Sequence, residues 1–273
     1  MGSRIRFAQL LARTPLHPFL RKLHGKLAWY MDIAGNWHNG DAEVNGERFL
    51  LRQAAPHIAL ALDVGANVGE WTQYLIDRNP NCTVHAFEAS PGTFPHLRQR
   101  FGGRPNVIPH HLGLAAVQGT LEFNDHGGKS CLSSFVRQAE IDPTPGMRRV
   151  TVPVTTVDAF AGDHQLAHID FVKLDTEGYE MPILRGMEAS LAARRISVIQ
   201  FEYGTFWIDA GETLANAAEF IRRHGYLLFR LRPNSLEPVQ YDQRRHECFK
   251  YSNFVAVVSP DLLSRWRVPL FQG

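Results

Sequence analysis

Two glycines follow an aspartate in the stretch "ALDVGANVGE", residues 61–70, at the point where an apolar run ends. Glycine has no side chain, so it permits a tight turn and lets a ligand approach the backbone closely. A turn of this kind between a buried strand and a helix is typical of a nucleotide-binding site. We therefore expect this stretch to contact a cofactor through Asp63, Gly65, Ala66, Asn67 and Gly69.

The turn departs from the glycine-rich loop that binds the pyrophosphate of a dinucleotide. The GxGxxG pattern needs glycine at the two positions that Asn67 and Glu70 occupy. Glu70 would also place a negative charge at the N-terminus of the following helix, where a phosphate group would bind. A nucleotide-like ligand with a positive charge and no phosphate suits this turn better. S-adenosylmethionine is such a ligand, and we expect it to be the cofactor.

A second acid closes the next apolar run, "TVHAFEA", in which Glu88 and Ala89 are the last two residues. A carboxylate about 20 residues beyond the glycine turn can accept hydrogen bonds from both ribose hydroxyls. Glu88 fits that spacing, so we expect Glu88 and Ala89 to contact the cofactor. Gly113, after a third expected strand, falls where adenine usually lies. Ser133 belongs to the Gly-, Ser- and Pro-rich stretch 119–150, which either binds the cofactor or substrate or is a plain loop.

The stretch "FVKLDTEGYE", residues 171–180, ends a further apolar run with alternating charges. Asp175 and Glu177 are candidates for binding the amino group of the ligand, for a general base, or for holding a divalent cation. Glu202, at the end of the following run "QFEY", would complete an acidic cluster. Lys173 could orient one of these carboxylates or stabilise a developing oxyanion.

Neighbouring carboxylates repel one another unless a proton or a cation is shared among them. If the expected ligand donates its methyl group to a hydroxyl, a group that removes the proton is needed, because an aliphatic hydroxyl is a poor nucleophile near neutral pH. Two arrangements satisfy both requirements. The cluster either shares protons and acts as a general base, or it holds a magnesium ion through Asp175, Glu177 and Glu202.

Strand-like and helix-like segments alternate from about residue 58 onward, which predicts a parallel sheet with helices on both faces. Ligands of such sheets bind at the carboxyl ends of the strands. Each of the motifs above lies at an expected strand end, so we expect them to form one site. The expected division is an α/β domain over residues 51–273 and a helical extension over residues 1–50, interrupted at Pro15 and Pro18.

The composition is that of a globular protein, with 273 residues, 44% hydrophobic residues and a net charge of +2. The small net charge gives no sign of a nucleic-acid partner. The cysteines lack CxxC spacing, which favours a reducing, cytoplasmic location. No apolar run reaches the roughly 18 residues of a transmembrane helix. Residues 1–31 contain basic but no acidic side chains, so this segment is either a solvated appendage or a basic amphipathic helix that contacts anionic lipid.

The motifs "DVGANVGEWT", "AFEASP", "KLDTEGYE" with a following "LRG", "FEY" and a late "NFVAV" resemble those of the FkbM family of methyltransferases. The likeness covers about residues 58–258. It implies a Rossmann-like class I S-adenosylmethionine-dependent methyltransferase fold, with a seven-stranded, mostly parallel sheet whose last strand is antiparallel. It also implies O-methylation of a hydroxyl on a sugar, a glycan or a polyketide-type natural product. Many members have "FEP" where this chain has "FEA", which leaves Glu88 in place.

Two other functions remain open on the sequence alone. An NAD-dependent dehydrogenase or epimerase shares the opening strand, glycines and acid, but it predicts a turn compatible with phosphate. A non-catalytic methyltransferase-like domain that only binds a partner would leave the acidic cluster without a role. The identity of the acceptor and the oligomeric state have no signature in the sequence.

Overall fold

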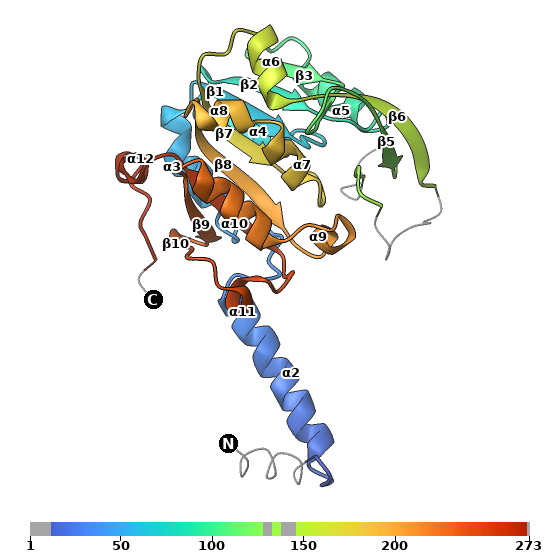
Figure 1. The fold of residues 1–273 in the computed structure, drawn as a ribbon, viewed down its shortest axis with the longest axis vertical. Coiled ribbons are helices and arrows are strands. Elements are labelled where there is room, and N and C mark those ends of the chain that lie inside the picture. The colour runs from blue at the N-terminus through green and yellow to red at the C-terminus, as the bar shows by residue number, and fades with distance from the viewer. Residues whose placement is uncertain (1–11, 128–132, 138–145, 272–273) are drawn as a thin grey trace.

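A twisted central sheet, shown in Figure 1, organises the part of the chain that the computed structural model describes, which is residues 12–127, 133–137 and 146–271. Eight strands follow the order β10-β9-β11-β8-β7-β1-β2-β3. Strands β3, β2, β1, β7 and β8 are parallel, whereas β11 is antiparallel to both of its neighbours. The strands span Leu60–Val64 (β1), Thr83–Phe87 (β2), Val107–His110 (β3), Ile169–Leu174 (β7), Ile196–Tyr203 (β8), Leu227–Arg232 (β9), Ser235–Pro238 (β10) and Ser252–Val257 (β11).

The expected mostly parallel sheet with an antiparallel last strand is confirmed, but the expected number of strands was wrong. The central sheet has eight strands rather than seven, and the additional one is β10. Ser235 pairs with Arg232, so a two-residue turn returns the chain along β9 as a hairpin. Pro238 cannot donate a backbone hydrogen bond and is tolerated because β10 lies at the edge of the sheet. Leu236 is fully buried, which fixes this short strand to the core.

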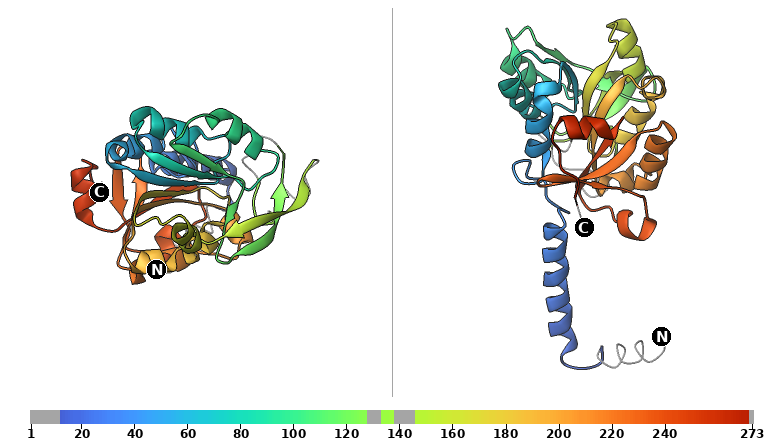
Figure 2. Two further views of the ribbon diagram at one scale, coloured as in Figure 1. Left: turned by 90° about the horizontal axis from the view of Figure 1, so that it is seen from above. Right: turned by 90° about the vertical axis from the view of Figure 1, so that its left-hand side faces the viewer.

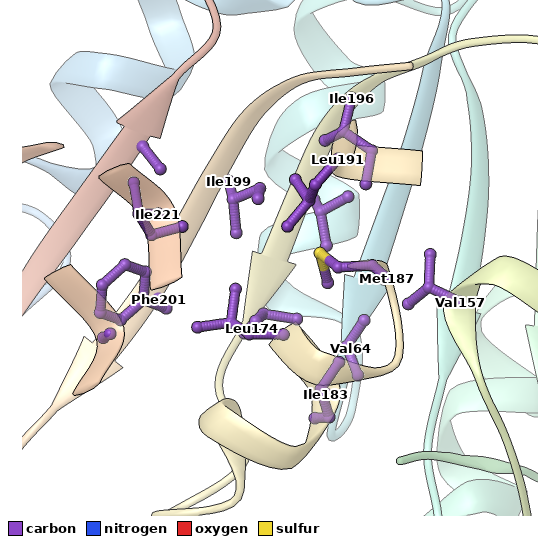
Figure 3. Packing of buried hydrophobic residues seen from close by; sticks show 14 of the residues in the cluster. Val64, Val157, Leu174, Ile183, Met187, Leu191, Ile196, Ile199, Phe201 and Ile221 are labelled. Carbon is purple, nitrogen blue, oxygen red and sulfur yellow. The ribbon is translucent and has the colours of Figure 1, made fainter. Parts of the chain in front are cut away.

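Helices cover both faces of the sheet, because its central strands are apolar on both sides. One apolar cluster packs α3, α4, α5 and α12 against the sheet, and the other packs α6 to α10 against the opposite face. Figure 3 shows part of the second cluster, in which Met187 and Leu191 face Ile196 and Ile199 of β8. The helices span Glu47–Ala54 (α3), Glu70–Arg78 (α4), Phe94–Phe101 (α5), Val157–Asp163 (α6), Glu180–Arg185 (α7), Glu188–Ala192 (α8), Phe206–Asp209 (α9), Leu214–Arg223 (α10), Gln243–His246 (α11) and Pro260–Arg265 (α12).

A second, three-stranded sheet lies beside the carboxyl end of β3, where the sequence suggested a long excursion over residues 119–150. Its strands are Gly113–Leu114 (β4), Gly119–Asp125 (β5) and Arg148–Thr155 (β6), in the order β4-β6-β5. Strand β6 was expected, whereas β5 was not. Buried Phe123 of β5 shows that the excursion has its own apolar side. Part of the "GGKSCLSS" stretch lies outside the described residues.

The N-terminal part consists of a projecting helix and a segment that joins the body of the molecule. Helix α2 (His17–Ala34) extends away from the sheet in Figure 1 and in the right-hand view of Figure 2. Helix α3 spans the expected domain boundary at residue 50, and both Leu50 and Leu51 are buried in the core. No helix of the described ranges combines the length and apolar character needed to cross a membrane.

Candidate functional site

The turn between β1 and α4 is bonded to the ends of both neighbouring strands. The backbone N–H groups of Gly65 and Ala66 donate to the carbonyl of Phe87 in β2, at 3.0 and 2.9 Å. On the other side, the N–H of Asp175 donates to the carbonyl of Val64 at 3.0 Å. Gly65 has a φ of +78°, and a Cβ there would lie 1.8 Å from the carbonyl oxygen of Asp175. Glycine is therefore required at this position by the approach of two backbones.

Two buried oxygen atoms of this turn have no hydrogen-bond partner among the described residues. They are Oδ1 of Asp63 and Oδ1 of Asn67. The other oxygen of Asp63 accepts a hydrogen bond from the Thr72 hydroxyl at 2.6 Å. Burial raises the pKa of Asp63, and the nearby charge of Lys173 only partly opposes this effect. Since a buried acceptor without a donor is costly, the turn suits a ligand that brings N–H groups.

Glu88 lies at the carboxyl end of β2 with its carboxylate fixed by backbone donors. One oxygen accepts from the N–H of Asn67 at 2.9 Å, and the other accepts from the N–H of Ser90 at 2.7 Å. Burial raises the pKa of Glu88 to about 7 although these two hydrogen bonds oppose it. A carboxylate oxygen can accept more than one hydrogen bond, so both oxygens remain able to accept from a diol.

The carboxyl ends of β7 and β8 bring together the acidic cluster, which we define as Asp175, Glu177 and Glu202. One carboxylate oxygen from each residue lies within 4.8 Å of the others. Lys173 Nζ donates to Oδ2 of Asp175 at 2.6 Å. The sequence-based expectation that these four side chains come together is met in their geometry.

The three carboxyl groups of the acidic cluster differ in protonation. Burial raises the pKa of Glu177 to about 9, with the charges of Asp175 and Glu180 adding to the effect. Burial and the same neighbouring acids also raise the pKa of Glu202. For Asp175 burial acts in the same direction, but the charge of Lys173 and a hydrogen bond with Glu202 outweigh it, so its pKa is lowered. Before any ligand binds, the charge of Lys173 thus favours the ionised form of Asp175, whereas burial favours the protonated forms of Glu177 and Glu202.

A strained loop sets the position of Glu177. Its φ is +54°, and the φ of Gly178 is +98°. The loop is held by Glu180, whose carboxylate accepts from the N–H of Thr176 at 2.9 Å and from its hydroxyl at 3.0 Å. Glu180 is fully buried, and these hydrogen bonds hold the loop in addition to any interaction of its charge with the dipole of α7. Residues held in such conformations concentrate at functional sites.

Two adjoining cavities occupy this edge of the sheet. The smaller, of about 290 Å³, runs from Glu88 and Ala89 to the acidic cluster. Its remaining wall is mostly apolar and is formed by Phe87, Leu112, Leu114, Phe123 and Phe135, beside Gly113 and Ser133. The larger cavity, of about 620 Å³, is lined by charged and polar groups, among them Glu47, Arg48, Asp63, Glu70, Lys173 and Asp175.

Nearly all of the expected site residues line one or both cavities, and Gly69 is the exception. A Cβ at Gly69 would lie 2.3 Å from the ring of Phe101, so this glycine serves the packing of α4 against α5. Ala66 and Lys173 line the larger cavity. Ser133 lines the smaller one, and its hydroxyl also accepts from the N–H of His126 at 3.0 Å.

Several residues of the site were not found from the sequence. Gly40 and Tyr251 line both cavities, although they lie far apart in the chain. Burial raises the pKa of Tyr251, and the charges of Glu202 and Glu47 add to this effect. Glu47 accepts from Gln200 at 3.1 Å and from Asn253 at 3.2 Å. The only signals for these positions were an acid before an apolar helix and polar residues opening the last strand.

Comparison with known proteins places this site in a family. The family model described as "Methyltransferase FkbM domain" matches residues 63–228. Hexuronic acid methyltransferase AglP of Haloferax volcanii is 26% identical over 181 residues, which cover 62% of this chain and 66% of that protein. Methyltransferase 1 of Beauveria bassiana is 26% identical over 149 residues, which cover 49% of this chain and 60% of that protein. The chain thus spans about two thirds or less of these curated relatives.

Among solved structures, that of Methyltransferase FkbM from Methylobacillus flagellatus KT is similar, with a TM-score of 0.46 and 14% identity. The similarity covers 73% of this chain and 43% of that one. The strand order and directions are those of the expected class I methyltransferase fold, with β10 as one additional edge strand. The family match begins at Asp63 in β1, ends at Leu228 in β9, and contains both Glu88 and the acidic cluster. The chain therefore belongs to the FkbM methyltransferase family.

Proposed function

We propose that the protein is an S-adenosylmethionine-dependent O-methyltransferase that methylates a hydroxyl group of a sugar or glycan. The observation that carries this proposal is the smaller cavity, which joins Glu88, the carboxylate expected to bind ribose, to the acidic cluster. A cofactor held at one end would meet an acceptor hydroxyl at the other. The relative named as a hexuronic acid methyltransferase supports a sugar acceptor. A polyketide-type hydroxyl is the other acceptor class implied by the family resemblance.

The residues of the two cavities fit the cofactor. Glu88 would accept from the ribose hydroxyls, and the apolar wall with Gly113 would hold the adenine. The unpartnered oxygens of Asp63 and Asn67 would accept from the amino group of the methionine portion. S-adenosylmethionine supplies an electrophilic methyl group on a sulfonium, so the protein has mainly to align and deprotonate the acceptor.

Within this proposal Glu177 accepts the proton of the acceptor hydroxyl after the positive charge of the bound cofactor has lowered its pKa enough to ionise it. A general base works best when its pKa lies near the working pH. Burial raises the pKa of Glu177 to about 9, and a positive charge bound beside it would bring that value closer to neutrality. Asp175 stays ionised against Lys173 and orients the hydroxyl, while protonated Glu202 donates to Asp175. The positive charge of Lys173 offsets the negative charge of Asp175, so that the acidic cluster carries little net charge before the reaction.

The same carboxylates offer a second way to activate the hydroxyl. Asp175, Glu177 and Glu202 could hold a magnesium ion, since three oxygens that lie this close suit a hard cation. The metal would lower the pKa of a hydroxyl bound to it. We favour shared protons, because Lys173 already supplies a buried positive charge at Asp175.

The dehydrogenase alternative is disfavoured by the start of α4. The helix begins with Glu70 in its first turn, directly after Gly69, and Glu70 lines the larger cavity. A pyrophosphate would have to bind next to this carboxylate. A nucleic-acid acceptor is not expected, because the net charge is only +2.

Calorimetric titration with S-adenosylmethionine, S-adenosylhomocysteine and NAD tests the cofactor. We expect both sulfur nucleotides to bind, and Glu88→Gln to weaken S-adenosylhomocysteine binding by about tenfold to a hundredfold through lost hydrogen bonds to a charged acceptor. The exposed Glu122 provides a matched control, Glu122→Gln, which should bind normally. Binding of NAD without either sulfur nucleotide would refute the proposal.

Turnover is tested separately with a methyl donor labelled on its methyl group. The acceptors to compare are glycans that contain a hexuronic acid, the matching neutral glycans and hydroxylated polyketides. Labelled sugar ethers are the expected product. Cofactor binding without transfer to any of these acceptors would favour a non-catalytic binding domain.

A further inference from the structure

Helix α2 exposes an unusual amount of apolar surface. None of its residues is buried, and it projects from the body of the molecule in Figure 1 and in the right-hand view of Figure 2. Large apolar side chains from residue 16 to residue 33 are between 37% and 66% exposed. They are Leu16, Phe19, Leu20, Leu23, Leu27, Trp29, Tyr30, Met31 and Ile33. An apolar surface of this size on one helix indicates a binding partner.

The apolar side chains of α2 form a stripe. Leu16, Leu20, Leu23 and Leu27 recur at intervals of three and four residues, which places them on one side of a helix. Three cations, Arg21, Lys22 and Lys26, lie outside this stripe, and Trp29 and Ile33 lie on the same side of the helix as Lys22 and Lys26. Asp32 is the first acidic residue of the sequence, and its carboxylate pairs with Lys250 of the body at 2.6 Å. The helix is therefore both amphipathic and cationic.

A helix of this composition needs an external surface to stabilise it. In proteins most helical stability comes from the packing of an amphipathic face rather than from intrinsic propensity, and α2 has no buried residue. Gly25 in the middle of α2 costs about 1 kcal/mol relative to alanine. Burial of the leucine stripe would offset these costs.

Charge decides between two kinds of partner. A second copy of α2 would bury the leucines but would bring three further cations beside Arg21, Lys22 and Lys26, without acids to pair with them. An anionic lipid surface would bury the same stripe and attract the same cations. Gly25 and the cations make α2 too polar to cross the bilayer. We propose that α2 lies in the plane of an anionic membrane surface, with its leucine stripe in the headgroup region.

The C-terminal end of α2 is fixed to the body beside the candidate site. The Asn36 side chain donates to the carbonyl groups of Asn45 and Leu231, at 2.7 and 3.0 Å. The His38 N–H donates to the carbonyl of Tyr251 at 2.9 Å. Tyr251 and Gly40 both line the two cavities. A membrane bound to α2 would therefore lie at a set orientation to the site.

Sedimentation of the full chain with lipid vesicles tests the proposal. The vesicles consist of phosphatidylcholine alone or of phosphatidylcholine with phosphatidylglycerol. We expect binding to the second kind only, and weaker binding as salt is raised. The variant R21Q/K22Q/K26Q should bind about a hundredfold more weakly, since each basic residue near the surface contributes about fivefold. The variant L20S/L23S/L27S should also lose binding, at unchanged charge.

A matched control variant tests whether vesicle binding depends on the cations of α2 or on any positive charge of the protein. The variant R52Q/R98Q/R104Q removes three exposed cations from the body and should bind vesicles as the unchanged protein does. The two α2 variants should retain the thermal unfolding temperature of the unchanged protein, because α2 has no buried residue. The assay uses neither cofactor nor acceptor, so its outcome is independent of the proposed enzymatic function.

Three results would overturn the proposal. They are equal binding to both kinds of vesicle, no binding to anionic vesicles, and equal loss of binding in the α2 and body variants. A dimer in analytical ultracentrifugation that L20S/L23S/L27S dissociates, without vesicle binding, would assign α2 to a second copy of the chain.

Discussion

Lys173 Nζ lies 2.6 Å from Oδ2 of Asp175, with the lysine buried and the aspartate partly exposed to the cavities. The two side chains leave the same end of β7, two positions apart. Burial opposes the charge of Lys173, but the charges of Asp175, Glu47 and Asp63 outweigh this and raise its pKa. The lysine is therefore a permanent cation beneath the acidic cluster, and its partner cannot be removed without consequence.

Asp175→Asn should lower both activity and stability. The substitution leaves the buried Lys173 without its ionic partner, which is strongly destabilising. Urea unfolding should show a reduced midpoint, and the double variant K173M/D175N should regain much of the loss. The double variant should remain inactive. A single variant as stable as the unchanged protein would show that the ion pair contributes nothing.

Glu177→Gln should separate catalysis from binding. We expect turnover to fall by about a hundredfold or more, because the amide cannot accept the proton of the acceptor. The affinity for S-adenosylhomocysteine should change little, since Glu88, Asp63 and Asn67 are untouched. Single-turnover kinetics and calorimetry give the two quantities, with Glu122→Gln as the exposed control. If Glu177→Gln and Asp175→Asn both methylate normally, the base lies elsewhere.

The stability of the protein should fall as pH rises from about 5 to about 9. The folded protein holds the proton of Glu177 up to a pKa of about 9, whereas the ordinary value is 4.5, so unfolding releases a proton in this window. The contribution is complete below the ordinary pKa and is lost above the folded one. Glu88 and Glu180, with pKa values of about 7, act in the same direction at lower pH.

Thermal unfolding at a series of pH values measures this effect. The Glu177→Gln variant cannot titrate at this position, so its unfolding temperature should decline less steeply between pH 7 and pH 9. Parallel curves for the variant and the unchanged protein would mean that the pKa of Glu177 is not raised by folding.

Gly65→Ala should unfold the turn at the end of β1. The added Cβ would lie 1.8 Å from the carbonyl oxygen of Asp175, at a φ of +78°. Gly211 is a suitable comparison, because it has a φ of +67° with no atom within 4 Å of an added Cβ. Gly211→Ala should cost only about 1 kcal/mol of unfolding free energy. Equal losses in urea unfolding would show that the close approach at Gly65 is relieved by movement.

Removal of divalent cations should leave the rate of methylation unchanged. In the shared-proton form of the acidic cluster, the charge of Lys173 and protons shared among the carboxyl groups balance the negative charge without a metal ion. The assay is run after treatment with a chelator and again after addition of magnesium. A rate that disappears on chelation and returns with magnesium would assign the three carboxylates to a metal ion.

Strand ends were predictable because their pattern is local. An apolar run that stops at an acid marks both the end of a buried strand and a polar side chain at the edge of the sheet. Asp63, Glu88 and Asp175 were found in this way. Glu202 could be grouped with Asp175 because adjacent parallel strands end at the same edge, and β7 does pair with β8.

The missing parts of the fold and site depend on contacts between distant segments. Tyr251 opens an antiparallel strand, so it reaches the carboxyl ends of β7 and β8 from the start of β11. Glu47 reaches the site through its contacts with Gln200 and Asn253, which no local pattern indicates. Strand β10 has four residues, too few for a recognisable alternation. Gly69 has the residue type expected in a ligand-binding turn, but glycine is needed there because a Cβ would collide with the ring of Phe101.

The hydrogen bonds from Gly65 and Ala66 to Phe87, and from Asp175 to Val64, tie three strand ends into one unit. That unit carries the residues proposed to bind the cofactor and to deprotonate the acceptor, and these are needed whatever the acceptor is. Gly40, which lines both cavities, belongs instead to a segment that makes no such bonds to the turn in the described structure. Within the proposed function, substitutions in that segment can therefore alter which acceptor fits without disturbing the bonds that hold the three strand ends together. This division would let related proteins take different acceptors while the three tied strand ends stay unchanged.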